Sequence, residues 1–454
     1  MQDNRNFLGT EPIGKLLLKL SIPTVIAQLI NMLYNIVDRI YIGHILGEGS
    51  LALTGVGVCM PIIMIVSAFA ALVSSGGAPR ASIYMGKQDN DSAEQILGNC
   101  FSLQIVVSLF LTVILLIFGK DLLLAFGASE NTIGYATDYM RIYAFGTLFV
   151  QLTLGMNAFV TAQGFTKISM LSVLIGAICN IVLDPVFIFG FHMGVKGAAL
   201  ATVLSQAIST IWVVLFLCGK KTQIRLRKAC LLLKAKVIVP CVMLGLAAFI
   251  MQASESVVSV CFNSSLLRYG GDIAVGAMTI LTSVMQFALL PLQGLGQGAQ
   301  PIISYNYGAK RADRVKEAYF LLLKIDVGFS FALWVLVMAF PRAFAAMFTS
   351  DAALIAYTGN ALRIYLMAIL IFGIQMACQM AFTSLGKAVS SIIVAVMRKF
   401  VLLLPLIYIM PHIFTGNQAM AVYMAEPVAD VLAVSFTSVL FYFQFRKVLR
   451  QIEG

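Results

Sequence analysis

Twelve long apolar stretches constrain the fold of this chain more than any other feature of its sequence. A helix needs roughly 20 apolar residues to cross a bilayer, and every stretch is at least that long. Because the chain is 60% hydrophobic and 11% charged, with a mean hydropathy of +0.93, we expect an all-α integral membrane protein with 12 transmembrane helices. The stretches cover approximately residues 15–42, 51–77, 94–118, 132–160, 168–190, 195–218, 237–267, 273–300, 315–340, 353–380, 389–411 and 419–445.

The distribution of positive charge predicts the orientation of these helices. The net charge is +11, and with the N-terminus placed inside, 24 of the 31 Lys and Arg residues fall on inward loops, inward helix ends and the termini. This is the positive-inside pattern. It predicts a multi-pass protein of the cell membrane with both termini cytoplasmic. The basic segment 219–236 then faces the anionic lipid surface, so membrane lipids, and not nucleic acid, are the expected partner.

An internal repeat divides the chain into two halves. Eight identities recur at a constant interval of 222 positions (301 − 79), and a shift held over about 90 residues without a gap indicates duplication. The matched pairs are Pro79/Pro301, Ser82/Ser304, Gly86/Gly308, Tyr135/Tyr357, Arg141/Arg363, Tyr143/Tyr365, Thr161/Thr383 and Gly164/Gly386.

Each half holds six helices, so both halves enter the membrane from the same side, as parallel repeats do. We therefore expect two pseudo-symmetric six-helix lobes with a cleft between them. The N-terminal lobe would span residues 1–218, the basic cytoplasmic linker 219–236 and the C-terminal lobe 237–454. This is the architecture of a transporter that alternates between two open states, although a duplicated structural bundle would share it.

An aspartate in an apolar helix marks the first candidate site. Asp184 lies in "CNIVLDPVFIFG", where an ionised carboxylate is costly. Asn180 is four residues earlier and shares its helix face, and Pro185 displaces a backbone carbonyl. Counting along the helices places Asp38 and Thr202 at a similar depth. These oxygens suit H⁺ or a hard cation such as Na⁺ at Asp184 and Asn180, although Asp184 could instead serve only the kinked helix.

The C-terminal lobe has acids of its own. Glu255 interrupts the seventh apolar stretch, while Glu426 and Asp430 are four residues apart in the twelfth. By depth they could face one cavity and bind substrate or a second cation, or they could be structural. The repeat does not copy these acids between the lobes, because Leu406 occupies the position that corresponds to Asp184. The lobes are thus expected to share a scaffold and differ in chemistry.

Nothing in the chain indicates catalysis. It contains no nucleotide-binding G-x-x-x-x-G-K-[ST] loop. The eight Cys residues form no C-x-x-C pair and the three His residues are far apart, so no cofactor or zinc site is expected. The glycine-rich "GLGQG" at 294–298 is interpreted as close helix packing. Transport would therefore have to be driven by an ion gradient.

Several motifs resemble the multidrug and toxin extrusion (MATE) family, most closely its MepA-like bacterial branch. They are "LSIPTVIAQLINMLYNIVDRIYIGHILG", "NIVLDPVFIFG", "VKGAALATVLSQ" and "PLQGLGQGAQPIISYNYGAK". The resemblance covers nearly the whole chain and implies two lobes of six helices with Na⁺- or H⁺-coupled efflux of lipophilic, often cationic drugs. One branch of the family has its coupling-ion site at positions that match Asp38, Asn180, Asp184 and Thr202. Another branch uses a glutamate that matches Glu255.

We therefore expect a secondary active multidrug antiporter that functions as a monomer. The alternative within the same superfamily is a flippase for lipid-linked oligosaccharides, which would need an arginine-rich cavity. An intramembrane enzyme is a third class, but no Ser/His or His–metal constellation supports it.

Overall fold

The computed structural model describes residues 7–45, 47 and 49–453, and these form helices and connecting turns without any strand. The elements are α1 (Phe7–Thr10), α2 (Ile13–Gly43), α3 (Gly49–Gly86), α4 (Asn90–Ala125), α5 (Ile133–Ala162), α6 (Thr166–Pro185), η1 (Val186–Gly190), α7 (Val195–Cys218), η2 (Lys228–Cys230), α8 (Ala235–Gly308), α9 (Ala312–Ala339), α10 (Pro341–Ala346), α11 (Ala352–Tyr365), α12 (Ile369–Ser384), α13 (Ala388–Val396), η3 (Met397–Leu403), α14 (Leu404–Ile413), η4 (Thr415–Asn417) and α15 (Gln418–Glu453).

The described helices cross a bilayer twelve times. Ten helical runs are long and apolar enough to span it, and α11 with α12 forms one further span that is bent by 50°. One of the ten, α8, has 74 residues and is broken at Gly271, whose φ of 67° lies outside the helical region. At 1.5 Å per residue, α8 would measure about 111 Å, far more than the ~30 Å hydrocarbon core. It is therefore two spans, and the expected twelve-helix fold is confirmed.

Two spans are less regular than their sequence predicted. The stretch 353–380 was expected as one helix, but a turn between Tyr365 and Ile369 bends it. Both segments pack on α8 and α15, but α12 packs mainly on α9, whereas α11 also packs on the short helix α10. The stretch 389–411 contains the π-helical segment η3. Local π geometry widens a helical turn and often occurs at functional sites.

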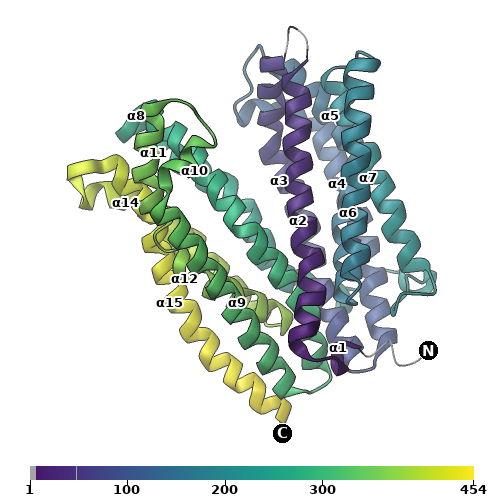
Figure 1. Ribbon diagram of the computed structural model, residues 1–454. Coiled ribbons are helices and arrows are strands. Elements are labelled where there is room, and N and C mark those ends of the chain that lie inside the picture. The colour runs from purple at the N-terminus through teal and green to yellow at the C-terminus, as the bar shows by residue number, and fades with distance from the viewer. Residues whose placement is uncertain (1–6, 46, 48, 454) are drawn as a thin grey trace.

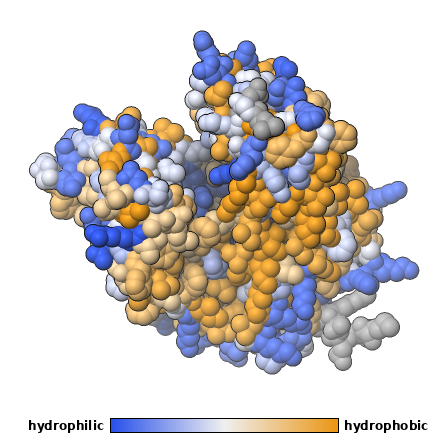
Figure 2. Space-filling model, turned by 45° about the horizontal axis from the view of Figure 1, so that its top comes forward, coloured by the Kyte–Doolittle hydropathy of each residue, from blue (hydrophilic) through white to orange (hydrophobic). Residues whose placement is uncertain are grey.

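The molecule has the shape of a V (Figure 1). Helices α2–α7 form one arm, and α8–α15 form the other. The arms meet on the side where α1 and the C-terminus lie, which we call the terminal side, and they diverge toward the opposite side. Figure 2 shows the resulting hollow between the arms, together with a broad hydrophobic band on the surface between hydrophilic ends. This is the surface pattern of a protein that is embedded in a bilayer with a cleft open on one side.

The duplication is visible in the geometry. Thr161 hydrogen-bonds to Ser169 Oγ at 3.0 Å in the first lobe, and Thr383 approaches Ser391 Oγ at 3.3 Å in the second. Each of the two serines and each of the two threonines is separated from its counterpart by 222 positions. Gly164 and Gly386, another matched pair, both follow a helix end with positive φ values of 83° and 69°. Equivalent residues thus make equivalent local structures.

The lobes meet through glycines that allow their backbones to touch. A side chain at Gly86 would overlap the carbonyl oxygen of Tyr305, and a side chain at Gly308 would overlap that of Ile83. These contacts are reciprocal under the 222-residue repeat, which is what a pseudo-two-fold axis between the lobes requires. The expectation that "GLGQG" packs closely is also confirmed, because Gly294 lies against Val25.

Two segments reinforce the terminal side. The short helix α1 is held by Asn306, which donates to the carbonyl of Leu8 at 3.0 Å, and by Arg314, which donates to the carbonyl of Glu11 at 2.7 Å. The linker between α7 and α8 packs on the first lobe, because Gln163 Oε1 accepts from the backbone N–H of Ile224 at 3.0 Å. The basic linker is therefore an ordered part of the base of the molecule.

The Gly86→Ala variant tests the contact between the lobes. We expect it to lose stability by about 1–3 kcal/mol, because the added methyl group has no space beside Tyr305. The measurement is the thermal unfolding midpoint in detergent. The matched control is Gly134→Ala, also within a helix but with open space around its Cβ position, which should be neutral or slightly stabilising. Equal behaviour of the two variants would contradict a close backbone contact at Gly86.

Candidate functional site

The four residues predicted for the N-terminal lobe lie together. Asn180 Nδ2 is 3.4 Å from Asp184 Oδ1 and 3.5 Å from Thr202 Oγ1. Asp184 is fully buried, and Asp38 is almost fully buried. The cluster therefore joins α2, α6 and α7 inside the lobe, and the structure brings together what the sequence predicted to meet.

Pro185 accounts for the local form of this site. Asn180 and Asp184 are one turn apart on α6, so they share a face. Regular α-helix ends at Pro185, and the π-helical segment η1 follows it. The ring of a proline displaces the preceding carbonyls and removes a backbone donor. The widened turn after Asp184 is the consequence expected from the sequence.

The carboxyl groups of Asp38 and Asp184 interact directly. They lie close enough for each to influence the ionisation of the other, and because two neighbouring buried carboxylates repel each other, a proton on one of them is stabilising. Three acceptor atoms of the cluster have no donor partner in the structure: Asp38 Oδ1, Asn180 Oδ1 and Asp184 Oδ2. Buried acceptors without donors are costly, so this group of oxygens is suited to a proton or a small cation.

Two tyrosines complete the cluster, and sequence reasoning missed both. Tyr139 on α5 lies near Thr202 and Asp38, and Tyr34 lies near both aspartates. Tyr34 precedes Asp38 by four residues in an α-helix, so the i, i+4 spacing was a signal that could have identified it. Tyr139 comes from a different helix, and no local pattern connects it to the site.

The acids predicted in the C-terminal lobe have basic partners. Arg398 Nη2 is 2.9 Å from Glu426 Oε1, and Arg398 Nε is 2.8 Å from Asp430 Oδ1. All three side chains are almost completely buried. The guanidinium group also lies over the ring of Phe372, 4.8 Å from its centroid. One arginine thus holds two acids that are one helical turn apart on α15.

The third acid, Glu255, belongs to a separate pair. Lys399 Nζ is bonded to Glu255 Oε1. The Lys399 side chain is 4% exposed, whereas that of Glu255 is 52% exposed. Phe249, about 9 Å nearer the terminal side along α8, packs on Phe69 of the other lobe. Glu255 therefore lies beyond this contact, on the side toward which the arms of the molecule diverge (Figure 1).

The positions of Arg398 and Lys399 correct the sequence analysis, which had counted both among the inward, loop-side cations. They are buried in η3, within a membrane span. Side chains of adjacent residues in a regular helix point about 100° apart. Arg398 accordingly reaches acids on α15, whereas Lys399 reaches Glu255 on α8. Two cations in the middle of an apolar stretch signal intramembrane partners as clearly as the acids do. The predicted substrate or cation role of Glu255, Glu426 and Asp430 stays a prediction.

Asp326 on α9 is a further buried acid that sequence reasoning missed. Both of its carboxyl oxygens, and the hydroxyl of Ser330 one turn later, are buried without a partner in the structure. Gly373 of α12 lies against this face of α9. The repeat places Gln104 and Ser108 at the corresponding positions of the first lobe, and the Gln104 amide donates to the Ala70 carbonyl at 3.3 Å. With no cation beside it, Asp326 is compatible with its surroundings in the neutral, protonated form.

Two pseudo-symmetric lobes of six spans, with titratable groups inside each and a cleft between them, define a membrane transporter. The MatE family model matches residues 23–186 and 247–409, one copy in each lobe. The chain belongs to this family of MATE transporters, as its motifs predicted, and it is not an enzyme.

Relatives along the full length agree with this assignment. The chain is 26% identical to the multidrug export protein MepA of Staphylococcus haemolyticus, over 91% of both chains. The solved structure of the MATE multidrug transporter DinF-BH is 36% identical, with a TM-score of 0.89 over 97% of this chain and 98% of that chain. A MOP superfamily transporter from Pyrococcus furiosus shares the fold, with a TM-score of 0.90 at 22% identity over 98% of both chains.

The buried arginine provides a test of the C-terminal cluster. We expect Arg398→Met to cost about 3–5 kcal/mol, because it leaves two buried carboxylates without a cation. Neutralising the acids as well, with Glu426→Gln and Asp430→Asn, should restore most of that loss. Thermal unfolding of the purified variants measures both effects. Lys399→Met serves as a comparison and should cost less, because its partner Glu255 is half exposed. If the triple variant were as unstable as Arg398→Met, charge compensation would not be the role of the arginine.

Proposed function

We propose that this transporter is a secondary active multidrug exporter that exchanges H⁺ or Na⁺ for lipophilic, cationic compounds across the cell membrane. Relatives named as a multidrug export protein and a multidrug transporter match it along nearly its full length. Among the described residues, the buried interiors of the lobes contain more acids than bases, which suits a pathway for cations: the acids include Asp38, Asp184, Asp326, Glu426 and Asp430, and the bases are Arg398 and Lys399. The charge distribution supports cytoplasmic termini, and with that orientation the structure is open to the outside.

The observation that carries this proposal is the pair of facing carboxyl groups, Asp38 and Asp184. They are buried, they lack enough donors, and they lie on different helices. Because the pair in this geometry needs one proton, we propose H⁺ as the ion that it binds. Binding or release of that proton changes the charge of the pair and hence the packing of the helices that contribute it.

Helix α2 connects this site to the contact between the lobes. Asp38 lies toward one end of α2, and toward the other end Thr24 Oγ1 donates to the Gly294 carbonyl at 2.6 Å. Gln28 Nε2 likewise donates to Gln297 Oε1 at 3.2 Å across the lobes. A change in the position of α2 at Asp38 therefore reaches α8, which belongs to the other lobe. Coupling then requires only that the proton and the substrate differ in affinity for the two arrangements.

The proton gradient is sufficient to drive export. Exchange of one proton for one monovalent cation moves no net charge across the membrane, so the pH gradient drives it, and each pH unit supplies about 1.4 kcal/mol, or a roughly tenfold concentration ratio. For an electrically neutral substrate, one net charge crosses in each cycle, and 100 mV of membrane potential adds about 2.3 kcal/mol.

A flippase for lipid-linked oligosaccharides receives less support. A pyrophosphate group would need unpaired cations in the cleft, but Arg398 and Lys399 are already paired with Glu426, Asp430 and Glu255.

Ethidium efflux from drug-sensitive cells tests the proposed function. At matched expression, we expect Asp184→Asn to reduce efflux at least about tenfold, to the level of cells without the transporter, because the amide cannot bind and release the proton. Glu255→Gln should retain most of the activity, since its partner Lys399 lies outside the proton site. Normal efflux by Asp184→Asn would eliminate the aspartate pair as the coupling site. A wild-type protein that does not export ethidium would redirect the search for substrates.

Proteoliposomes distinguish the two coupling ions. We expect an imposed pH gradient without Na⁺ to drive ethidium transport, and an equal Na⁺ gradient at constant pH to have no effect. The Asp184→Asn protein in the same vesicles controls for leakage. Transport driven by the Na⁺ gradient alone would show that the acceptor atoms of Asp38, Asn180 and Asp184 bind Na⁺ instead.

A further inference from the structure

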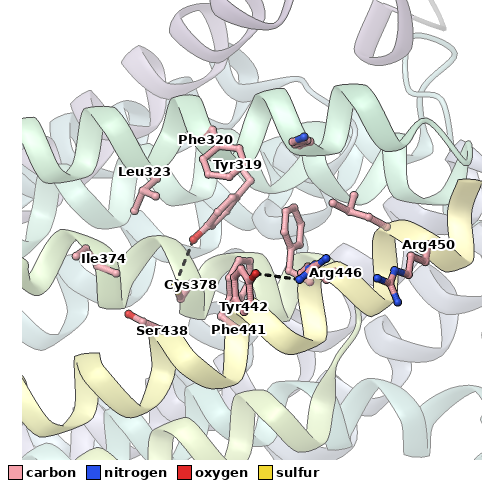
Figure 3. A pocket seen from close by; sticks show the side chains of 13 residues that line it. Tyr319, Phe320, Leu323, Ile374, Cys378, Ser438, Phe441, Tyr442, Arg446 and Arg450 are labelled. Atoms are coloured by element: carbon pink, nitrogen blue, oxygen red, sulfur yellow. Dashed lines mark hydrogen bonds between the residues drawn. The ribbon is translucent and has the colours of Figure 1, made fainter.

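A groove of about 480 Å³ lies on the C-terminal lobe, outside the cleft, between α9, α12 and α15 (Figure 3). Its floor is aromatic, because the rings of Tyr319 and Phe441 pack at 4.5 Å between centroids. Figure 3 shows Leu323 and Ile374 toward one end and Arg446 and Arg450 toward the other. The groove is therefore amphipathic along its length.

The basic end of the groove has no acid to neutralise it. Lys316, Arg446 and Arg450 line it, and none of the described residues that line it is acidic. Arg446 is held in place by Tyr442, to whose hydroxyl it donates a hydrogen bond at 2.9 Å and over whose ring it lies. Arg446 and Arg450 are one helical turn apart, so both can approach one anionic group.

Further cations surround this end. Lys447 lines a neighbouring hollow together with Arg446 and Arg450. Burial, and after it the nearby Lys447 ammonium, lowers the pKa of Lys387, which lies in the turn between α12 and α13. Two other basic side chains at the terminal side do have acidic partners: Lys19 lies 2.9 Å from Glu11, and Arg227 lies 2.8 Å from Glu94. The positive charge at the groove thus lacks a counter-charge from the described chain.

The dimensions fit one leaflet of a bilayer. Ser438 and Arg450, which line opposite ends of the groove, are twelve residues apart on α15, or about 18 Å at 1.5 Å per residue. Half of the ~30 Å hydrocarbon core is about 15 Å. An acyl chain whose headgroup lies at Arg450 would therefore extend to the middle of the membrane, beside Ile374.

We propose that this groove is a binding site for an anionic phospholipid. The phosphate group is bound by Lys316, Arg446 and Arg450, and one acyl chain lies along the aromatic floor. Such a lipid would connect α9 with α15 and stabilise the base of the C-terminal lobe. The proposal is independent of the transported substrate and of the coupling ion.

Native mass spectrometry of the protein with phosphatidylglycerol or phosphatidylcholine of equal chain length tests the site. We expect wild type to retain phosphatidylglycerol preferentially. The double variant Arg446→Gln/Arg450→Gln should reduce that retention about tenfold or more, because each basic residue near a membrane surface contributes to anionic lipid binding. The control Lys120→Gln/Arg268→Gln removes two exposed charges at other surfaces of the molecule and should leave lipid retention unchanged.

A second variant, Leu323→Phe, narrows the apolar part of the groove without changing its charge, and it should also reduce phosphatidylglycerol retention. Thermal unfolding establishes that each variant is folded. Equal retention of both lipids by wild type, or equal losses in the groove and control double variants, would overturn the proposal. Displacement of the lipid by inorganic phosphate alone would overturn it as well, because the site would then bind a free anion.

Discussion

Every charge that this chain places inside the membrane needs a partner or a proton, and the interior of both lobes follows from that constraint. An unpaired charge in hydrocarbon is too costly to keep without a compensating contact. The first lobe meets this requirement with two neighbouring buried carboxyl groups, Asp38 and Asp184, between which we propose a shared proton. The second lobe meets it with ion pairs in which Arg398 and Lys399 serve three acids. Only the first arrangement can change its charge without breaking an ion pair, which suits it to ion coupling.

Duplication explains the framework but not the chemistry. The reciprocal contacts of Gly86 and Gly308 and the paired turns at Gly164 and Gly386 are shared by the two lobes. The charged residues buried inside the lobes are not shared, because the position corresponding to Arg398 is Gly176 and the position corresponding to Asp184 is Leu406. A backbone contact tolerates only glycine in either copy, whereas an interior polar site can be replaced when its whole set of partners changes. The two lobes have therefore kept the backbone contact between them and diverged in their interiors.

Much of the fold was readable from local pattern. The length of each apolar stretch predicted a membrane span. Asn180, Asp184 and Pro185 predicted a polar site at a kinked helix, because all three lie close together in one helix. The estimate of depth in the membrane also placed Asp38 and Thr202 correctly near Asp184. It succeeded because each residue of a straight helix adds a constant rise along the helix axis. The bend between Tyr365 and Ile369 could not be predicted in this way, because the segment contains no proline. Arg398 and Lys399 were missed as partners of the buried acids. Counting Lys and Arg residues on each side of the membrane assigns them to loops and does not consider how deep in the membrane each one lies.

The sequence by itself determined the helices, the repeat and the presence of titratable groups at membrane depth, because these depend on composition and periodicity along one chain. Only the tertiary structure decided which groups are partners. Glu426 and Asp430 lie 28 and 32 positions from Arg398, and Tyr139 meets Thr202 across two helices. Such contacts depend on how helices rotate about their axes and pack against one another, and that rotation is set by the whole lobe and not by any local segment.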